Sequence, residues 1–325
     1  MEQDDRDRRE RERERCHEVH PIGTIGTTGT TGPIDPIGPE YPAAVQTPPR
    51  EGRLKIALMD AGIGLLAAAA AVRRLRPDAD LVLSSDPDGM PWGPRSSQEL
   101  TARALTVAEA AAVHRPDVLI VACNTASVHA LPALRARLEP DLPVIGTVPA
   151  VKPAAAGGGP VAVWATPATT GSPYQRSLTE EFAADVNVTE VPCPGLADAV
   201  EHADDMAIGR AVAAAAERTP DGARAVVLGC THYELIAERI RAALQRPGRP
   251  PLALYGTADA VAAQALRRIG HQPTPGTPDE GTLTVILSGR EEELPPAARV
   301  YDEGRLLQAG RRGRDRLPLS SGGRP

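Results

Sequence analysis

Short apolar runs rich in Val, Ile and Leu alternate with longer amphipathic, alanine-rich segments from about residue 54 to residue 290. Apolar runs of this length, bounded by turn residues, predict buried strands, and the segments between them have the length and period of helices. We expect strands over 54–59, 80–85, 118–122, 143–147, 161–164, 186–191, 225–228, 252–255 and 282–287. Strands that alternate with helices predict an α/β fold with mainly parallel sheets flanked by helices.

The two ends of the chain have a different character. Residues 2–15 are almost all charged, and residues 20–50 are rich in Pro, Gly and Thr, so neither segment has an apolar face to bury. We interpret 1–50 as a disordered extension, either a plain solvated tail or an arm that binds a partner. Residues 304–325 are rich in Gly, Arg and Pro and are expected to form a disordered tail.

Composition narrows the class of protein. The net charge of −6 argues against a nucleic-acid binder, since no broad basic surface is implied. No run approaches 18 uninterrupted apolar residues, so no membrane span is expected, and the charged N-terminus does not resemble a signal peptide. The 4 cysteines show no CxxC spacing and no disulfide-scaffold density, which favours a reducing cytoplasm.

Two of these cysteines follow near-identical apolar runs. Val118–Ala122 leads into Cys123-Asn124-Thr125, and Ala225–Gly229 leads into Cys230-Thr231-His232. In open α/β sheets, ligands bind at the carboxyl ends of the strands, where both thiols are predicted to lie. Two thiols in matched positions suggest one acid and one base that face each other across a cleft. A free Cys is more often a small buried residue, and this is our interpretation of Cys193.

Several motifs carry a resemblance to a known family. They are Asp60-Ala61-Gly62-Ile63-Gly64, Pro91-Trp92-Gly93, Ala122-Cys123-Asn124-Thr125, Ala165-Thr166-Pro167-Ala168-Thr169, Cys193-Pro194-Gly195 and Gly229-Cys230-Thr231-His232. In this order they resemble the motifs of glutamate racemases, members of the cofactor-independent aspartate/glutamate racemase superfamily. The resemblance implies two pseudo-symmetric α/β domains, one of 51–150 plus 252–303 and the other of 151–251, with the active site in the cleft between them.

The chemistry of the thiol pair is consistent with this resemblance. Racemisation requires removal of a weakly acidic α-proton from one face of the substrate and delivery of a proton to the other. A Cys pKa near 8.5 can be lowered by neighbours, so thiol and thiolate suit both tasks. By resemblance, Cys123 takes the proton from the D-enantiomer and Cys230 takes it from the L-enantiomer. No cofactor and no metal are expected.

Other residues are expected around the thiols. Asp60 ends the first strand and is expected to pair with the substrate ammonium or to tune Cys123. The resemblance implies that His232 assists Cys230 and that Glu201 is a further carboxylate near the site, although Glu201 is equally plausible as a solvated helix residue. Expected substrate-binding residues, several of them also helix-capping candidates, are Asp60, Ala61, Trp92, Gly93, Asn124, Thr125, Thr166, Thr169, Thr231 and His232.

Two positions depart from the family pattern. The family's Asp-Ser-Gly reads Asp60-Ala61-Gly62, and its Pro-Tyr-Gly reads Pro91-Trp92-Gly93. Loss of one hydrogen bond to a charged group costs about 1.5–3 kcal/mol, so glutamate turnover or side-chain preference is open to change. Neither departure removes the acid–base pair.

Alternative functions remain at this point. A pyridoxal-phosphate racemase needs a Schiff-base lysine, and neither Lys55 at a strand start nor Lys152 in a Pro-flanked loop is attractive. The glycine pattern fits a Rossmann dehydrogenase poorly, and the ligand spacing fits a zinc site poorly. The placement of the two thiols fits a dithiol redox protein poorly. An aspartate or hydantoin racemase and a non-catalytic binding protein stay open. The favoured function is glutamate racemisation that supplies D-glutamate for peptidoglycan, and the family implies a homodimer.

Overall fold

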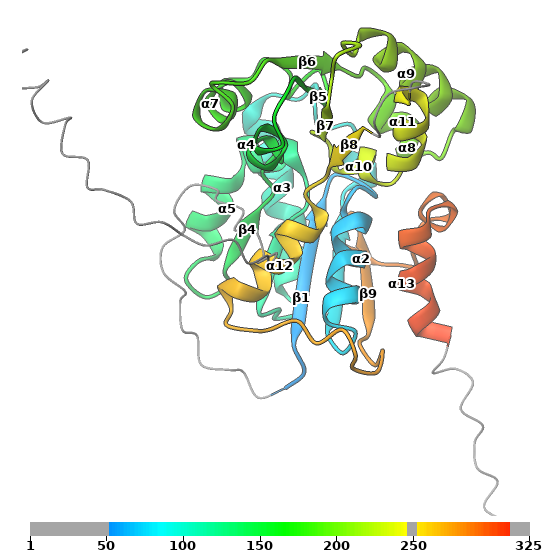
Figure 1. The fold of residues 1–325 in the computed structure, drawn as a ribbon. Helices are drawn as coiled ribbons and strands as arrows, with labels where there is room; N and C mark the ends of the chain where they lie inside the picture. The colour runs from blue at the N-terminus through cyan, green and yellow to red at the C-terminus, as the bar shows by residue number, and fades with distance from the viewer. Residues whose placement is uncertain (1–51, 246–251, 313–325) are drawn as a thin grey trace, which may run out of the picture. The chain divides into compact units, whose positions relative to one another are not determined.

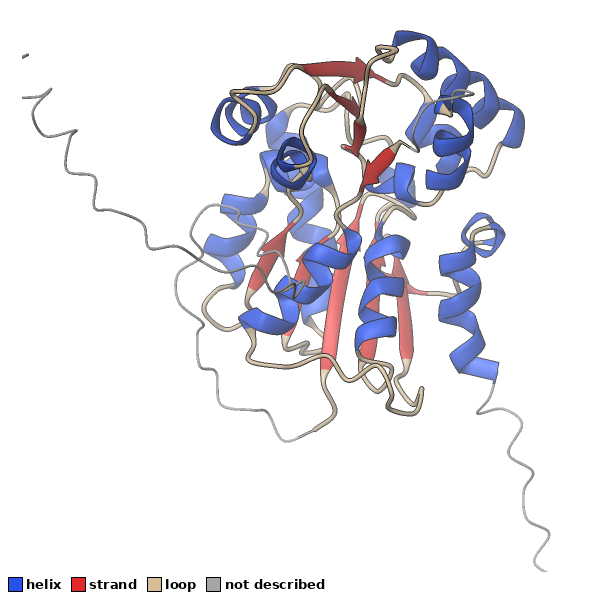
Figure 2. Ribbon diagram, viewed as in Figure 1, coloured by secondary structure: helices blue, strands red, loops and turns tan. Residues whose placement is uncertain are grey.

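Two sheets organise the part of the chain that the computed structural model describes, residues 52–245 and 252–312 (Figures 1 and 2). The first sheet has the order β10-β9-β2-β1-β3-β4 and the second the order β6-β5-β7-β8. Every paired strand is parallel except the β9–β10 pair. The strands are β1 Lys55–Asp60, β2 Asp80–Ser85, β3 Val118–Val121, β4 Val144–Gly146, β5 Val161–Ala165, β6 Val188–Pro192, β7 Ala225–Leu228, β8 Ala253–Tyr255, β9 Leu283–Leu287 and β10 Arg290–Glu291.

Helices connect the strands and flank the sheets. They are α2 Leu65–Leu75, α3 Ser97–Ala112, α4 Asn124–His129, α5 Leu131–Leu138, α6 Val151–Ala156, α7 Pro173–Phe182, α8 Leu196–Glu201, α9 Asp205–Arg218, α10 Thr231–Glu234, α11 Ala237–Leu244, α12 Ala258–Arg268 and α13 Asp302–Arg312, with short 3-10 turns at Pro87–Gly89 and Pro296–Val300. The predicted fold class, parallel sheets flanked by helices, is confirmed.

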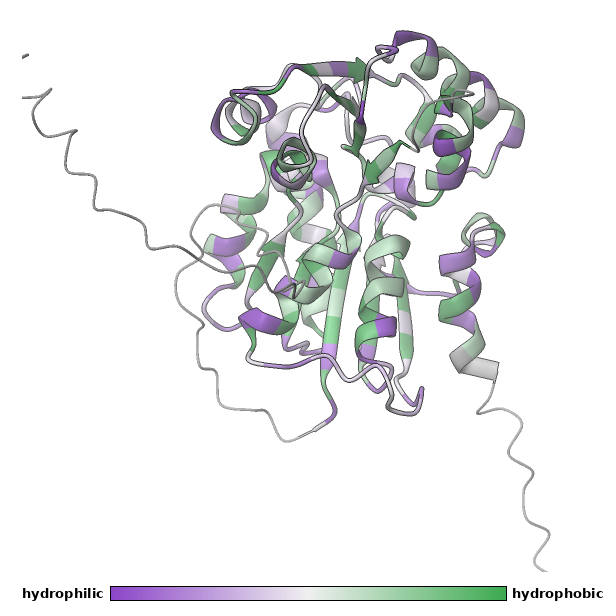
Figure 3. Ribbon diagram, viewed as in Figure 1, coloured by the Kyte–Doolittle hydropathy of each residue, from purple (hydrophilic) through white to green (hydrophobic). Residues whose placement is uncertain are grey.

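The first sheet is buried on both faces. Ile56 and Leu58 of β1 pack in one cluster with α2, and Ala57 and Met59 pack on the opposite face with α3. This alternation is the normal consequence of strand geometry. Figure 1 shows α2 and α12 side by side on one face of this sheet, and the strands appear as the apolar centre in Figure 3. A parallel sheet covered on both sides requires near-continuous apolar strands, which is why the sequence predicted these elements well.

The strand near residue 252, which we expected in the first domain, lies in the second sheet. β8 pairs with β7, with Val227 opposite Tyr255, so it completes the second sheet. The following helix, α12, packs against α2 and belongs with the first sheet as expected. The chain therefore adds β8 to the second sheet before it returns to the first sheet with α12. The predicted domain boundary at residue 251 is wrong for this strand. The division into two domains otherwise stays a prediction.

The predicted disordered tail from residue 304 is also wrong over its first part. Residues 302–312 form α13, which packs against α2, and Leu307 is buried. Just before it, the hydroxyl of Tyr301 donates a hydrogen bond of 2.7 Å to the carbonyl of Val200 on α8. Because this segment is rich in glycine and arginine, its amphipathic helix was not predicted. The predicted extension 1–50 and the remaining tail, 313–325, lie outside the described residues.

Candidate active site

Each sheet has a point at which its strand order reverses. In the first sheet β1 lies between β2 and β3, and in the second β5 lies between β6 and β7. Ligands of open α/β sheets bind at the carboxyl ends of the strands at such points. Asp60 ends β1 and Cys123 follows β3, while Thr166 follows β5 and Cys230 follows β7. The topology therefore places both thiols and Asp60 where ligand chemistry is expected.

The two thiols have matching local structure. Cys123 immediately precedes α4 with φ −145° and ψ 116°, and Cys230 immediately precedes α10 with φ −143° and ψ 133°. Both residues are buried, and no disulfide links them. Equivalent strand-to-helix turns thus present one thiol from each sheet, as the matched sequence runs predicted.

Both thiols line one cavity of about 730 Å³. Its walls are formed by segments after β1, β2, β3, β5, β6 and β7. The lining residues are Asp60, Ala61, Met90, Pro91, Trp92, Gly93, Pro94, Cys123, Asn124, Thr125, Thr166, Pro167, Ala168, Cys193, Pro194, Gly195, Ala197, Asp198, Gly229, Cys230, Thr231 and His232. A cavity that contains a few convergent polar groups in a largely apolar wall is the usual form of a small-molecule site.

A hydrogen-bonded chain leads away from Cys230. His232 Nδ1 lies 3.9 Å from the sulfur of Cys230, and His232 Nε2 lies 2.8 Å from Glu201 Oε2. The same carboxylate oxygen accepts the backbone N–H of Ile63 at 2.8 Å. Burial alone would lower the pKa of His232, but its hydrogen bonds to Cys230 and Glu201 outweigh burial and raise that pKa well above its usual value. The imidazolium form is therefore favoured beside Cys230.

Glu201 responds in the opposite sense. Burial would raise the pKa of Glu201, but the hydrogen bond and the positive charge of His232 outweigh it, so this pKa is lowered. Glu201 is thus the ionised partner of His232. The side chains of both residues are largely buried, with 12% of Glu201 and 5% of His232 exposed, which strengthens the pairing relative to a surface ion pair.

A different carboxylate accompanies Cys123. Asp60 is buried, hydrogen-bonds to Cys123, and accepts the hydroxyl of Thr231 at 3.2 Å. Burial raises the pKa of Asp60 to about 6, although His232 and the hydrogen bonds act in the opposite direction. Burial, reinforced by the negative charge of Asp60, raises the pKa of Cys123 well above its usual value. The two thiols therefore have unlike neighbours, a cation at Cys230 and a carboxyl group at Cys123.

Asn124 supplies unpaired polar atoms in the same cavity. Its side chain is 4% exposed, and within the described part of the chain neither Oδ1 nor Nδ2 has a hydrogen-bond partner. Buried amides are normally satisfied, so an unsatisfied one in a cavity wall points to a ligand. The described lining contains no Lys or Arg, so negative groups of a ligand would rely on amides, hydroxyls and His232.

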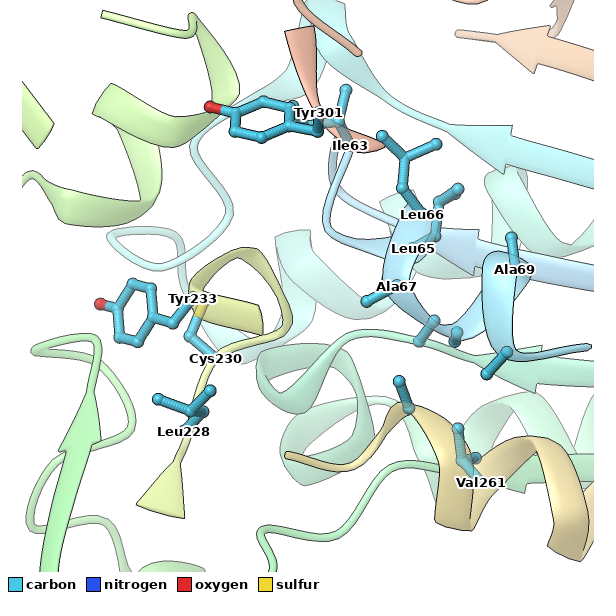
Figure 4. Close-up of a cluster of buried hydrophobic side chains, with 14 of the residues drawn as sticks. Ile63, Leu65, Leu66, Ala67, Ala69, Leu228, Cys230, Tyr233, Val261 and Tyr301 are labelled. Atoms are coloured by element: carbon cyan, nitrogen blue, oxygen red, sulfur yellow. The ribbon is translucent and has the colours of Figure 1, made fainter. Parts of the chain in front are cut away.

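The core continues directly behind Cys230. In Figure 4 the side chains of Cys230 and Tyr233 lie on the short turn after β7, above Leu228. The hydroxyl of the buried Tyr233 donates to the carbonyl of Cys193 at 3.3 Å. The Cys193 thiol donates to the carbonyl of Val191 at 3.3 Å, and burial raises its pKa to about 12. Cys193 is thus a buried, protonated part of the wall, consistent with the packing role we expected.

Most predicted site residues line the cavity. Two do not: Thr169 is buried beside Thr166, with their hydroxyls 3.2 Å apart, and Glu201 reaches the site only through His232. Sequence reasoning missed Met90, Pro94, Ala197 and Asp198 in the lining. These four residues lie close to recognised motifs in the sequence, and that proximity could have identified them.

Along residues 52–245 and 252–312, none of the helices has both the length and the apolar character that crossing a bilayer requires. In the same ranges, no group of three or more His, Cys, Asp or Glu side chains is arranged to hold a metal ion.

The fold and the site together define an α/β protein in which two thiols line one cavity. Comparisons with known proteins identify its family. Residues 64–270 match the model of the Asp/Glu/Hydantoin racemase family. A glutamate racemase of Sphingopyxis alaskensis is 35% identical over 255 residues, which cover 74% of this chain and 90% of the relative. A glutamate racemase of Roseiflexus sp. is 40% identical over 197 residues, or 58% of this chain and 70% of that protein.

A solved structure extends the comparison. The Escherichia coli glutamate racemase, in complex with L-glutamate and the activator UDP-MurNAc-Ala, superposes with a TM-score of 0.65 at 25% identity and covers 81% of this chain and 95% of its own. The chain therefore belongs to the Asp/Glu/Hydantoin racemase family, as its motifs predicted.

Proposed function

We propose that this protein interconverts L- and D-glutamate by proton transfer at the α-carbon between Cys123 and Cys230. One observation carries the proposal: matched strand-to-helix turns in the two sheets present one thiol each to a single cavity. Glutamate as the substrate is supported by relatives named glutamate racemase, one of which aligns over 90% of its length. No redox or Lewis-acid step is needed, because one proton leaves and one proton arrives.

The neighbours of the two thiols suit them to different roles. An imidazolium at His232, 3.9 Å from the Cys230 sulfur, stabilises negative charge on that sulfur. Burial and the Asp60 carboxyl group keep the proton on Cys123. The surroundings therefore suit Cys230 to the role of base and Cys123 to that of acid when L-glutamate is bound. Cys230 removes the α-proton and Cys123 delivers its proton to the opposite face.

The product state exchanges these roles. After one inversion Cys230 carries a proton and Cys123 is a thiolate, which is the state that D-glutamate requires. With D-glutamate, Cys123, which is hydrogen-bonded to Asp60, acts as the base, and Cys230, which lies beside His232, acts as the acid. The same pair of thiols thus works in both directions.

Substrate binding is assigned to the remaining polar groups. The Asp60 carboxylate pairs with the ammonium group, and the free carboxamide of Asn124 accepts from the ammonium and donates to a carboxylate. The hydroxyl groups of Thr125 and Thr166 complete the carboxylate contacts, while the Thr231 hydroxyl donates to Asp60.

We further propose that the D-glutamate serves peptidoglycan synthesis, the role that the motif resemblance implies. A reducing cytoplasm fits the three described cysteines, which are all free thiols. A homodimer stays a prediction, and sedimentation analysis of the full chain tests it.

The direct test is an assay of optical inversion with the purified full chain. L-Glutamate should become a racemic mixture, and L-aspartate and a hydantoin serve as alternative substrates. Cys123→Ser and Cys230→Ser should each lower turnover by about 10²–10⁴-fold, because each removes one positioned acid–base group. Cys193→Ser should lower turnover far less. A protein that inverts none of the three substrates would be the non-catalytic binding protein instead.

A further inference from the structure

The loop after β2 forms one continuous part of the cavity wall. Met90, Pro91, Trp92, Gly93 and Pro94 are the longest uninterrupted run of residues that line it. Trp92 has the largest side chain of the described lining and is only 2% exposed. The position of this one ring therefore strongly influences the shape of the space beside the thiols.

The indole is held from behind by an ion pair. Trp92 Nε1 donates to Asp86 Oδ2 at 3.0 Å, and Arg103 Nη1 of α3 donates to the same oxygen at 2.9 Å. Asp86 is buried, and neither it nor Arg103 lines the cavity. Because the one polar atom of its side chain is engaged by Asp86, the Trp92 indole presents only carbon atoms to a ligand. Such a surface selects by shape and not by charge.

The loop backbone is adapted to this arrangement. A Cβ atom at Gly89 would lie 1.9 Å from Asp86 Oδ2 and 2.1 Å from Arg103 Nη1, so only glycine leaves room for the pair. Arg95 in turn donates from Nε and Nη2 to the Gly89 carbonyl at 3.0 and 2.6 Å. Two arginines thus fasten the segment that carries Trp92, one through a carboxylate and one through a backbone carbonyl.

We propose that Trp92 is a specificity-determining residue, and that Asp86 and Arg103 are positioning residues that hold its indole against the substrate side chain. The inference rests on the proposed racemase function and adds a determinant of substrate choice. Glutamate and aspartate differ by one methylene, and a well-fitted pocket discriminates such a difference by about 10–200-fold. A fixed ring maintains that fit, whereas a loosened ring lets it relax.

The test compares Arg103→Met with Arg137→Gln. Arg137 also makes an ion pair with α3, at 2.7 Å to Glu109, but on an exposed surface. In Arg103→Met the KM for glutamate should rise about three- to tenfold, with kcat within about twofold, and the preference for glutamate over aspartate should fall by a similar factor. Arg137→Gln should match the wild type in all three quantities.

A double-mutant comparison separates positioning from general stability. Trp92→Phe keeps a ring but removes the N–H that Asp86 accepts. If Arg103 acts through the indole, Arg103→Met should add nothing to the KM of Trp92→Phe. Full additivity of the two changes, or an Arg103→Met protein with the same KM and substrate preference as Arg137→Gln, would overturn the proposal.

Fluorescence tests the positioning role without any turnover. Trp92 and Trp164 are the 2 tryptophans of the chain, and Trp164 is fully buried with its N–H donated to Thr219. Acrylamide quenching should therefore increase in Arg103→Met, through Trp92, and stay at the wild-type level in Arg137→Gln. A wild-type protein that inverts no amino acid contradicts the proposed function. If the wild type is active but Arg103→Met changes neither the quenching nor the KM, only the proposal for Trp92 is contradicted.

Discussion

His232 and Glu201 share a hydrogen bond of 2.8 Å between Nε2 and Oε2, and this bond connects one thiol of the site to a helix of the second sheet. Glu201 ends α8 and also accepts the backbone N–H of Ile63, which follows β1. The carboxylate therefore orients the imidazole, keeps it charged, and fastens α8 to the first sheet. A single side chain therefore links the surroundings of Cys230 to the relative placement of two segments that are 138 residues apart in the sequence.

Glu201→Gln should weaken this arrangement without removing it. The neutral amide cannot stabilise the imidazolium, so the pKa of His232 should fall and the alkaline limb of the pH–rate profile should move to lower pH. Near pH 8, kcat/KM should fall about tenfold or more. Because the two enantiomers have equal free energy, the loss must be equal in both directions. Glu190→Gln, which changes an exposed carboxylate that accepts the Gly171 N–H, is the control and should leave the profile in place.

Gly64→Ala is a test of the crowding around the site. A Cβ at this position would lie 2.3 Å from Asp60 Oδ2, 2.5 Å from His232 Nδ1 and 2.5 Å from Thr231 Oγ1. The backbone at Gly64 has ordinary helical angles, so alanine itself is not strained there. Turnover should fall by about 10²-fold or more, since small displacements of reacting groups are costly.

The matched control for this glycine is Gly209→Ala in the middle of α9. Its added Cβ would meet only Arg239 Nη2, at an ordinary 3.6 Å. Alanine should stabilise the helix by up to about 1 kcal/mol and leave turnover unchanged. Full activity of Gly64→Ala, measured beside this control, would contradict the described positions of Asp60 and His232.

The strands and turns that carry the site residues could be predicted from the sequence more fully than the contacts between those residues. Buried parallel strands have a strong local signature, so the ends of β3 and β7, and with them Cys123 and Cys230, were predictable. The pairing of Glu201 with His232 spans 31 residues, and no local pattern determines where a helix end meets a turn. Sequence reasoning therefore left Glu201 equally plausible as a solvated residue.

Two other errors have physical causes. The resemblance placed the strand near residue 252 in the first domain, and its short apolar run carries no information on which strand it pairs with. The helix α13 was missed because glycine and arginine are poor signals of burial, although Gly304 lets the chain pass close to the Ala298 carbonyl. The Trp92–Asp86–Arg103 contact joins three segments and could not be inferred from any one of them.

Asp60 should make the stability of the protein depend on pH in a characteristic direction. Its pKa is raised to about 6 by burial from a usual value of 3.8, so ionisation opposes folding. The contribution is most favourable below pH 4 and is lost as pH rises through about 6. Relative to the wild type, Asp60→Asn should therefore gain on the order of 3 kcal/mol in unfolding free energy between pH 4 and pH 7. Denaturant unfolding at both pH values measures this difference, and a pH-independent difference would contradict the raised pKa.

Glu234 should stabilise the crossing between the two sheets. Its Oε1 accepts the backbone N–H and the hydroxyl of Thr257, each at 2.8 Å, and its Oε2 accepts the N–H of Ala258 at 3.2 Å. Glu234→Ala should lower the unfolding free energy by about 2–4 kcal/mol, because it leaves buried donors at the start of α12 unpaired. The exposed Glu238, on neighbouring α11, is the control, and Glu238→Ala should change stability by less than about 0.5 kcal/mol.

The central claim is that two thiols act from opposite sides of one α-carbon, and the fate of the α-proton in deuterated water tests it most directly. At low conversion of L-glutamate, mass spectrometry should find one deuterium at the α-position of the D-glutamate formed. The unreacted L-glutamate should still carry its original hydrogen, because separate groups remove and deliver the proton. D-Glutamate that retains the substrate hydrogen, or deuterium that enters both enantiomers at equal rates, would indicate a single base and contradict the account.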